Sequence, residues 1–251
     1  MMRALINTLE EKWTEYLIET IVIILGILGA FALNNWHQST LDRQEEVSYL
    51  IKLHSDLNQD LILLDSFINY RESKVVSAQK LLDFKNNHIT EDQVQFFNEM
   101  INVFLWMEFS PNSSTLDELV STGNMSLITN ESIKKLLPTI IQINEVIVSA
   151  RDHMRREFDH YLYDRVAIYL DLSDYSQNDP KQLWRPDLKK IDSKNTKLIR
   201  SSIQFLEDTQ VRNGFFLAAA NNTYIIELYQ QLIDAVNELI GVLDQELLNS
   251  Q

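Results

Sequence analysis

The chain has 251 residues, of which 45% are hydrophobic, so it can bury a core and is unlike a disordered protein. A formal net charge of −14 argues against nucleic acid as a partner, because phosphate binding needs clustered Lys and Arg. With 5 Gly and 4 Pro there are too few turn residues for an all-β or α/β fold, and the absence of Cys excludes disulfides and thiolate chemistry.

The first predicted element is an apolar run at residues 17–33, LIETIVIILGILGAFAL, followed by Asn-Asn-Trp at residues 34–36. A helix from Leu17 to Trp36 would rise roughly 30 Å, which is about the thickness of a bilayer's hydrocarbon core. We therefore expect residues 16–36 to form a single transmembrane helix in the lipid bilayer, preceded by a juxtamembrane segment at residues 1–15.

Two features bear on whether this run is cleaved and which way it points. Residues 30–32, Ala-Phe-Ala, have the small-x-small pattern of a signal-peptide cleavage site, but the acidic segment before the run and its length favour an uncleaved anchor. Arg3 and Lys12 before the run balance Arg43 and Lys52 after it, so the positive-inside count is nearly a tie. Because a short segment ahead of a single apolar helix commonly stays cytoplasmic, we expect the larger part of the chain to be extracytoplasmic.

Four residues of the run are candidates for function. An ionisable group at membrane depth is costly and often functional, as in stator-like accessory proteins, but Glu19 lies only two residues inside the run. Its carboxylate can reach headgroup water, and we favour that interpretation. Gly26, Gly29 and Ala30 share one side of the helix, and small residues at this spacing permit close helix–helix approach and homo-oligomerisation. Small residues are also common in membrane helices, so both interpretations stay open.

Beyond the run, residues that are apolar except for His54 and Arg71 recur at alternating steps of three and four, which predicts a heptad seam. Its positions are Val47, Leu50, His54, Leu57, Leu61, Leu64, Ile68, Arg71, Val75, Ala78 and Leu82. No Pro or Gly lies between Gly29 and Leu82, so we expect the membrane helix to continue unbroken to residues 86–87. His54 is expected to hydrogen-bond a neighbour and Arg71 to reach the seam's edge; the alternative is a ligand-contacting or register-setting role.

Two shorter helices are predicted next. Thr90 is expected to begin the first, whose apolar face carries several phenylalanines and which Pro111 and Asn112 would break. Thr115-Leu-Asp-Glu118 has the pattern of a capping box and predicts a short second helix. Gly123 is expected to end that helix in a left-handed conformation.

Two long helices complete the predicted chain. Asn130 is expected to cap the first, whose seam extends to Leu172 and which Pro138 would kink near its first turns. A polar stretch at residues 173–193 follows, and a final helix starts near residues 192–193 with a bend at Asn213-Gly214. The predicted fold is all-α: an N-terminal transmembrane helix continuous with a long antiparallel helical bundle over residues 37–251.

The predicted long helix that begins after Asn130 contains the string Glu157-Phe-Asp-His160, a Glu-x-x-His of the kind that di-iron helical bundles use. His153, Glu157 and His160 share a helix face. A di-iron centre needs a second such pair and two further inward carboxylates, and the chain has no second Glu-x-x-His. We interpret this face as a salt-bridged polar surface and expect no metal or other cofactor.

The opening of the chain resembles that of an uncharacterised bacterial family. The likeness is carried by Tyr16, Leu17, Glu19, Gly26-Ile27-Leu28, Ala30 and Asn34-Asn35-Trp36, and in mid-chain by Thr115–Asn124, Leu127-Ile128 and Asn130. Members of that family begin with a glutamate, an apolar run containing Gly-Ile-Leu, and an Asn-x-Trp or Asn-Asn-Trp exit. The resemblance implies a single-pass helical protein of the bacterial inner membrane, of unknown function and without catalytic residues to transfer.

No residue pattern in the chain indicates an enzyme, because nucleophile elbows and phosphate-binding glycine loops are absent from it. We expect a membrane-anchored, non-enzymatic scaffold or interaction module that binds a protein partner, with the loop around Trp184 as a candidate contact. One alternative is a ligand-sensing bundle that acts through a membrane partner. Another is a stator-like accessory protein that uses Glu19.

Overall fold

The computed structural model describes residues 2–84, 92–176, 179–183 and 194–250, with the backbone alone for residues 2–12 and 175. Over these ranges the regular structure is helical and no strand is formed. The protein is all-α, as the composition and the helical periodicity predicted.

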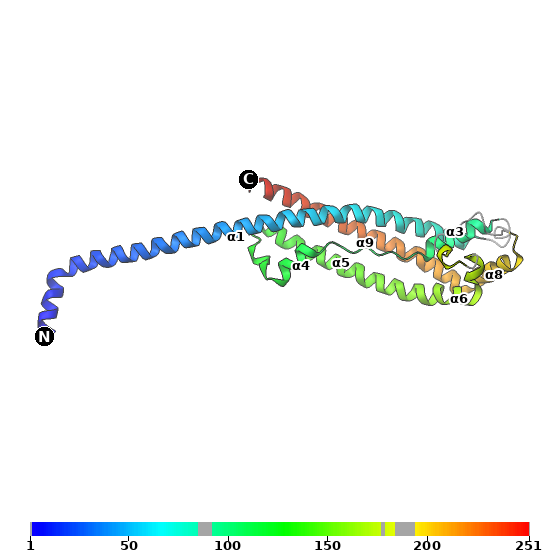
Figure 1. The fold of residues 1–251 in the computed structure, drawn as a ribbon, viewed down its shortest axis with the longest axis horizontal. Coiled ribbons are helices and arrows are strands. Elements are labelled where there is room, and N and C mark those ends of the chain that lie inside the picture. Colours follow the sequence, from blue (N-terminus) through cyan, green and yellow to red (C-terminus); the bar gives the residue numbers. More distant parts are fainter. Residues whose placement is uncertain (1, 85–91, 177–178, 184–193, 251) are drawn as a thin grey trace.

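One helix, α1 (Met2–Asp83), runs the length of the molecule. Figure 1 shows its N-terminal part projecting as a free rod and its C-terminal part packed in a bundle. Side chains are exposed throughout residues 13–41, and packing begins at Asp42. The helix crosses this boundary without a break, as predicted from the absence of Gly and Pro between Gly29 and Leu82.

The bundle is built on three long helices. They are the bundle part of α1, α5 (Glu131–Phe158) and α9 (Thr209–Leu248). Helix α9 packs against both others and runs antiparallel to them, so the C-terminus returns to the point where α1 leaves the bundle (Figure 1). Leucine, isoleucine and valine side chains from all three helices form the main hydrophobic core.

The fourth side of the bundle is a composite that contains the two predicted shorter helices. It consists of α3 (Gln93–Phe104), an extended segment at residues 105–113, α4 (Ser114–Ser121) and the 3-10 turn η1 (Asn124–Leu127). We call residues 105–113 the strap. These elements return along α1, from its C-terminal end to the base of the bundle. Pro111 lies in the strap, where it supplies no N–H for a helix.

The far end of the bundle, opposite the rod, holds short elements. They are the π-turn η2 (Asp159–Tyr163), α6 (Asp164–Tyr169), α7 (Leu172–Tyr175), η3 (Pro180–Gln182) and α8 (Thr196–Glu207). They enclose a second, aromatic-rich core. The predicted single helix from Asn130 to Leu172 is therefore wrong at its end: α5 passes into the π-turn, and Leu170 takes an extended conformation.

Helix termini test several sequence predictions. The side chain of Asn130 caps α5, and Gly123 has a φ of 76°, both as predicted. The capping box is wrong, because α4 starts at Ser114 and the Thr115 hydroxyl donates to Asp56 instead. The predicted start of a helix at Thr90 lies outside the described residues, and Asp92 caps α3.

The last predicted helix is divided in two at Asp208, whose side chain caps α9, and not at Asn213-Gly214. Gly214 has another role. A Cβ built on it would lie 2.7 Å from Leu162 Cγ and Cδ2, so its lack of a side chain lets α9 approach the π-turn closely.

Gly214→Ala is therefore expected to lower the free energy of unfolding by about 1–3 kcal/mol, because Leu162 is fully buried and has no space to withdraw into. Gly241→Ala is the matched control on the same helix, since a Cβ there meets nothing within 4 Å. It should stabilise by about 0.5–1 kcal/mol. Urea unfolding of the full chain in detergent micelles measures both changes in the free energy of unfolding. Changes of the same sign in the two variants would contradict the close approach of α9 to the π-turn at Gly214.

Candidate functional site

The exposed part of α1 is the first candidate site. Among the described residues, α1 is the one helix that is long and apolar enough to cross a membrane, and none of its most apolar 18-residue window is buried. Large apolar side chains from Trp13 to Trp36 face outward on all sides, for example Val22 at 62% and Phe31 at 63% exposure. Such a surface needs a cover that the described chain does not supply.

Glu19, Gly26, Gly29 and Ala30 all lie on this exposed part of α1. A Cβ built on either glycine would meet nothing within 4 Å, so the small-residue side of the helix is open. Self-association through these residues and a role for Glu19 stay predictions. Trp184, predicted to contact a partner, lies outside the described residues.

Where the rod enters the bundle, a cluster of polar side chains clamps it to the other helices. This base cluster consists of Arg43, Glu46, Thr129, Asn130, Glu246 and Ser250. Arg43 donates to Glu46 (2.5 Å) and to Glu246 (2.6 Å), and Asn130 also donates to Glu246 (2.8 Å). Bonding to Glu46 and Glu246 raises the pKa of Arg43, and bonding from Asn130 and Arg43 lowers the pKa of Glu246. The cluster joins the exposed rod directly to the ends of α5 and α9.

Arg43→Ala is expected to loosen this clamp. Glu46 is buried and would lose its cationic partner, so we expect a loss of about 1 kcal/mol, limited by the partial exposure of Arg43. Hydrogen exchange should quicken in the last two turns of α9 and stay unchanged at the far end. Arg212→Ala, at the far end of α9, is the control and should leave the C-terminal turns protected.

The buried face of α1 does follow a heptad seam, but only half of the predicted positions are correct. Leu50, Leu57, Leu64 and Ala78 are buried as predicted, and Arg71, expected at the edge of the seam, is buried as well. The other half lies one residue earlier than predicted. Its buried members are Glu46, Leu53, Asp60, Lys74 and Leu81, whereas Val47, His54, Leu61, Ile68, Val75 and Leu82 are only partly buried.

Three members of that second half are charged and lie at intervals of fourteen residues, so they share one face of α1. Glu46 accepts from the Thr129 N–H (2.5 Å), and Asp60 accepts from the Asn112 N–H (2.8 Å). Lys74 donates to the carbonyl of Leu105. We call these three residues the charged ladder. Asp60 and Lys74 bond backbone groups of the composite side, and Glu46 bonds the short segment between η1 and α5. These segments have no neighbouring strand or continuous helix to supply such bonds.

At the far end of the ladder, Lys74 lies beside a second buried cation, Arg71. Arg71 is 1% exposed and donates to the Asn222 side chain (2.9 Å) and the Met107 carbonyl (3.2 Å), and its Nε has no hydrogen-bond partner. Both cations lie near the Trp106 ring, at 6.0 Å for Arg71 and 5.5 Å for Lys74. Burial, and to a lesser extent the charge of Arg71, lowers the pKa of Lys74 to about 7.

Tyr70 completes the attachment of the strap. Its hydroxyl donates to the Leu105 carbonyl (2.5 Å) and accepts from the Met107 N–H (3.1 Å) and from Lys74 (3.1 Å). Burial raises the pKa of this phenol. The start of the strap is thus bonded through both donor and acceptor groups of its backbone.

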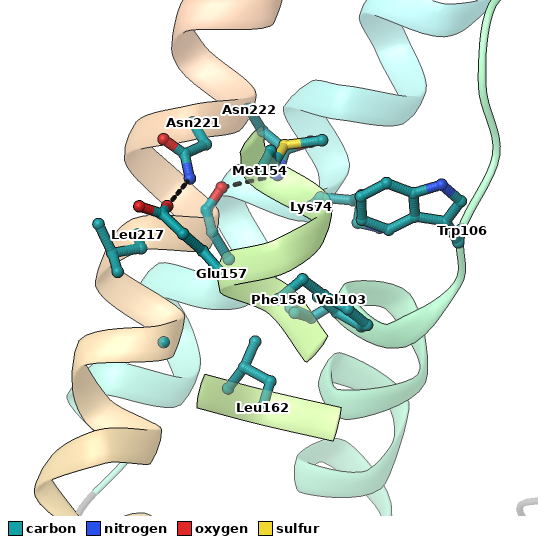
Figure 2. A pocket seen from close by; sticks show the side chains of 12 residues that line it. Lys74, Val103, Trp106, Met154, Glu157, Phe158, Leu162, Leu217, Asn221 and Asn222 are labelled. Carbon is teal, nitrogen blue, oxygen red and sulfur yellow. Dashed lines mark hydrogen bonds between the residues drawn. The ribbon is translucent and has the colours of Figure 1, made fainter. Parts of the chain in front are cut away.

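A narrow cavity lies next to this cation pair (Figure 2). Lys74, Trp106, Glu157, Asn221 and Asn222 are among the residues that line it, and Asn221 donates to Glu157 across 2.6 Å. Its volume is about 10 Å³, which is the space of a single water molecule and too small for an organic ligand. The polar interior of the bundle is filled mainly by its own side chains.

The histidines predicted from the sequence fall in ordinary environments. His54 contacts Asp244 across 3.0 Å, in line with the predicted bond to a neighbour. His153 pairs with Glu157 at 3.1 Å, and His160 lies edge-on to Tyr161. Over the described ranges, no group of three His, Cys, Asp or Glu side chains is arranged to hold a metal ion.

Arg71 was predicted to reach the edge of the seam, and that prediction is wrong. The Asn222 amide oxygen and the Met107 carbonyl give its guanidinium partners inside the bundle, so the side chain does not need solvent. The charged ladder was missed altogether, because a search for apolar periodicity passes over Glu46, Asp60 and Lys74. The signal available in the sequence was their fourteen-residue spacing, in register with Leu53 and Leu81.

Comparison with known proteins gives one finding. The profile of DUF6090, a family of unknown function, matches residues 19–183, about two thirds of the chain. The match starts in the exposed part of α1 and spans the bundle part of α1, the strap and α5. No curated protein and no solved structure matches the chain. The chain therefore belongs to DUF6090, a family of unknown function.

Proposed function

We propose that the protein is a membrane-anchored, non-enzymatic interaction module, in which α1 serves both as a single-pass anchor and as the spine of a rigid post. The observation that carries the proposal is the continuity of α1 from a fully exposed apolar segment into a packed bundle. A bilayer would cover the side chains that the protein leaves exposed. Trp36, at the end of the run and 68% exposed, suits the membrane interface.

The geometry favours a post over a flexible tether. From Trp36 to Asp83, α1 would rise about 70 Å at 1.5 Å per residue. The base cluster bonds the spine to the ends of α5 and α9 within a few residues of the exposed segment, and Asp60 and Lys74 of the charged ladder hold the composite side along the spine. The far end would therefore be held at a fixed distance from the membrane, where a protein partner could dock.

Membrane anchoring predicts a clear result in cell fractionation. Wild-type protein should stay in the membrane pellet after alkaline carbonate extraction. Ile24→Asp with Leu28→Asp should release it, because each acid at the centre of a span costs about 2.5–3.5 kcal/mol. Ile51→Asp with Ile62→Asp is the matched control, since both residues are exposed on the bundle part of α1. Release of the wild type, or equal release of both variants, would contradict the anchor.

The rigid post can be tested in the same protein. The chain has no Cys, so a single dye can be placed by Leu41→Cys or Val76→Cys, both at exposed positions of α1. Energy transfer to acceptor lipids in nanodiscs should be strong from position 41 and weak from position 76, about 60 Å from Trp36 by helical rise. A Gly-Ser linker inserted after Gln38 should raise transfer from position 76. Strong transfer from position 76 without the linker would contradict the post.

The stator-like alternative uses Glu19. The described structure shows Glu19 only as an exposed residue near the start of the apolar segment, and no partner group is aimed at it. Glu19→Gln that leaves assembly and phenotype unchanged would remove this alternative. A ligand-sensing role does not fit the filled interior of the bundle, and the cavities that could support one lie at the far end.

A further inference from the structure

Two cavities at the far end of the bundle adjoin each other and share Phe104 and Tyr163. The first, about 360 Å³, lies between α3 and the η2–α6 region and is lined mainly by apolar side chains, among them Phe97, Met100, Ile101, Val166 and Leu172. The second, about 460 Å³, is lined by Trp106, Arg155, Phe158 and Asp159 together with the end of α3. We call the two together the distal groove.

The floor of the distal groove is preformed. Phe97, Met100 and Phe104 are at most 6% exposed, so packing holds them in place. The Phe158 ring lies 5.4 Å from Phe104 and 6.1 Å from Tyr163, and these rings connect the two cavities. Both volumes fall within the range of about 300–1,000 Å³ that is usual for ligand sites. The groove thus has a continuous aromatic and aliphatic floor with an apolar end and a polar end.

The polar end carries a guanidinium that the protein itself pairs only weakly. Arg155 is more than half exposed, and the carboxylates of Asp159 and Glu108 lie 3.8 and 3.9 Å from it, beyond hydrogen-bond distance. The Arg155 guanidinium lies 5.1 Å from the Trp106 ring, which the buried Arg71 and Lys74 also approach. Among the described residues that line the two cavities, Arg155 is the basic one, and its contacts to carboxylates are long, so its N–H groups can still pair with an anion.

We propose that the distal groove binds a long-chain carboxylate, with the carboxylate group on Arg155 and the hydrocarbon chain running past Phe104 and Tyr163 into the apolar cavity. A carboxylate can replace the two long contacts of Arg155 by a bidentate pair. The ligand's hydrocarbon chain would cover the apolar floor of the groove. A cationic amphiphile could not pair with Arg155, and a neutral one would accept a weaker hydrogen bond from Arg155 than a carboxylate does. This inference does not depend on the proposed membrane anchor.

The test is binding of dodecanoate to the full chain in nanodiscs. Trp106 lines the groove, so Trp13, Trp36 and Trp184 are replaced by Phe and the emission of Trp106 is recorded. Dodecanoate should produce a saturable change. Ala167→Phe fills the apolar cavity from an exposed lining position and should abolish it, which also corrects for probe that merely enters the lipid.

Charge recognition is tested with two neighbouring arginines. Arg155→Gln should weaken dodecanoate binding about tenfold, the usual worth of one charged hydrogen-bonded pair. Arg156→Gln, at an exposed position outside both cavities, should leave it unchanged. Dodecanol should bind wild type and Arg155→Gln alike. The proposal is overturned if dodecanoate gives no saturable change, if Ala167→Phe leaves that change intact, or if the two arginine variants bind equally.

Discussion

Lys74→Met is expected to stabilise the protein by about 1–4 kcal/mol at pH 7, although it removes two hydrogen bonds. Lys74 is 2% exposed, lies beside Arg71, and makes its hydrogen bonds to the neutral Leu105 carbonyl and Tyr70 hydroxyl. A methionine fills the same space without a charge that must be removed from water. Tyr70 still donates to the Leu105 carbonyl, so that acceptor keeps a partner.

The same variant should change how stability depends on pH. The pKa of Lys74 is lowered to about 7 in the folded protein, whereas an unfolded lysine titrates near 10.5. Between these values the unfolded chain holds a proton that the folded protein has released, so the free energy of unfolding rises with pH, by up to about 1.4 kcal/mol per unit. The advantage of Lys74→Met should therefore shrink from pH 7 to pH 9.5.

Urea unfolding followed by circular dichroism, from pH 6 to pH 9.5 in detergent micelles, measures this difference. Lys135→Met, at an exposed position of α5, is the matched control and should parallel the wild type. A constant difference between Lys74→Met and wild type over this range would contradict a pKa of Lys74 lowered to about 7 in the folded protein. The range stops below pH 10, because Tyr70, whose pKa burial raises, acts in the opposite sense above it.

Arg71→Ala is expected to have the largest destabilising effect, about 3–5 kcal/mol. The variant removes a large buried side chain, leaves the Asn222 amide oxygen without its donor, and frees the Met107 carbonyl at the start of the strap. Arg71→Lys should recover little, because one ammonium group cannot reproduce the planar fork that reaches both acceptors.

A double-mutant cycle with Asn222→Ala separates the Arg71–Asn222 bond from the cavity left by truncation. The coupling energy should be about 1.5–3 kcal/mol for a buried bond to a charged donor. Arg156→Ala, at an exposed position of α5, should change stability by less than about 0.5 kcal/mol. A loss below about 1 kcal/mol in Arg71→Ala would mean that this part of the bundle opens to solvent.

Local chemistry explains which elements were predictable. Asn130 caps α5 and Gly123 adopts φ 76° because each meets a requirement set by a few adjacent residues. The unbroken α1 follows from its lack of helix breakers, and alternating steps of three and four located Leu50, Leu57 and Leu64 on its buried side. The candidate membrane segment was equally predictable from the sequence, because its length and composition are properties of one contiguous stretch.

The other half of the α1 seam was not predictable by the same reasoning. Each charged position of this half is followed directly by an apolar residue that fits the alternating steps of three and four equally well. Examples are Leu61 after Asp60 and Val75 after Lys74. Apolar periodicity assumes that buried positions are apolar. Here they are charged because they bond the backbone of a segment more than thirty residues away along the chain.

The sequence alone determined an all-helical chain, its apolar N-terminal segment and the continuity of its first helix, because each depends on neighbours along one helix. Only the tertiary structure decided that the fourth side of the bundle includes an extended strap, that Arg71 and Lys74 are buried together, and that aromatic residues of α3 and α5 meet in the distal groove. A buried charge or an extended segment is stable only when its distant partners are in place, and linear sequence does not specify those distances.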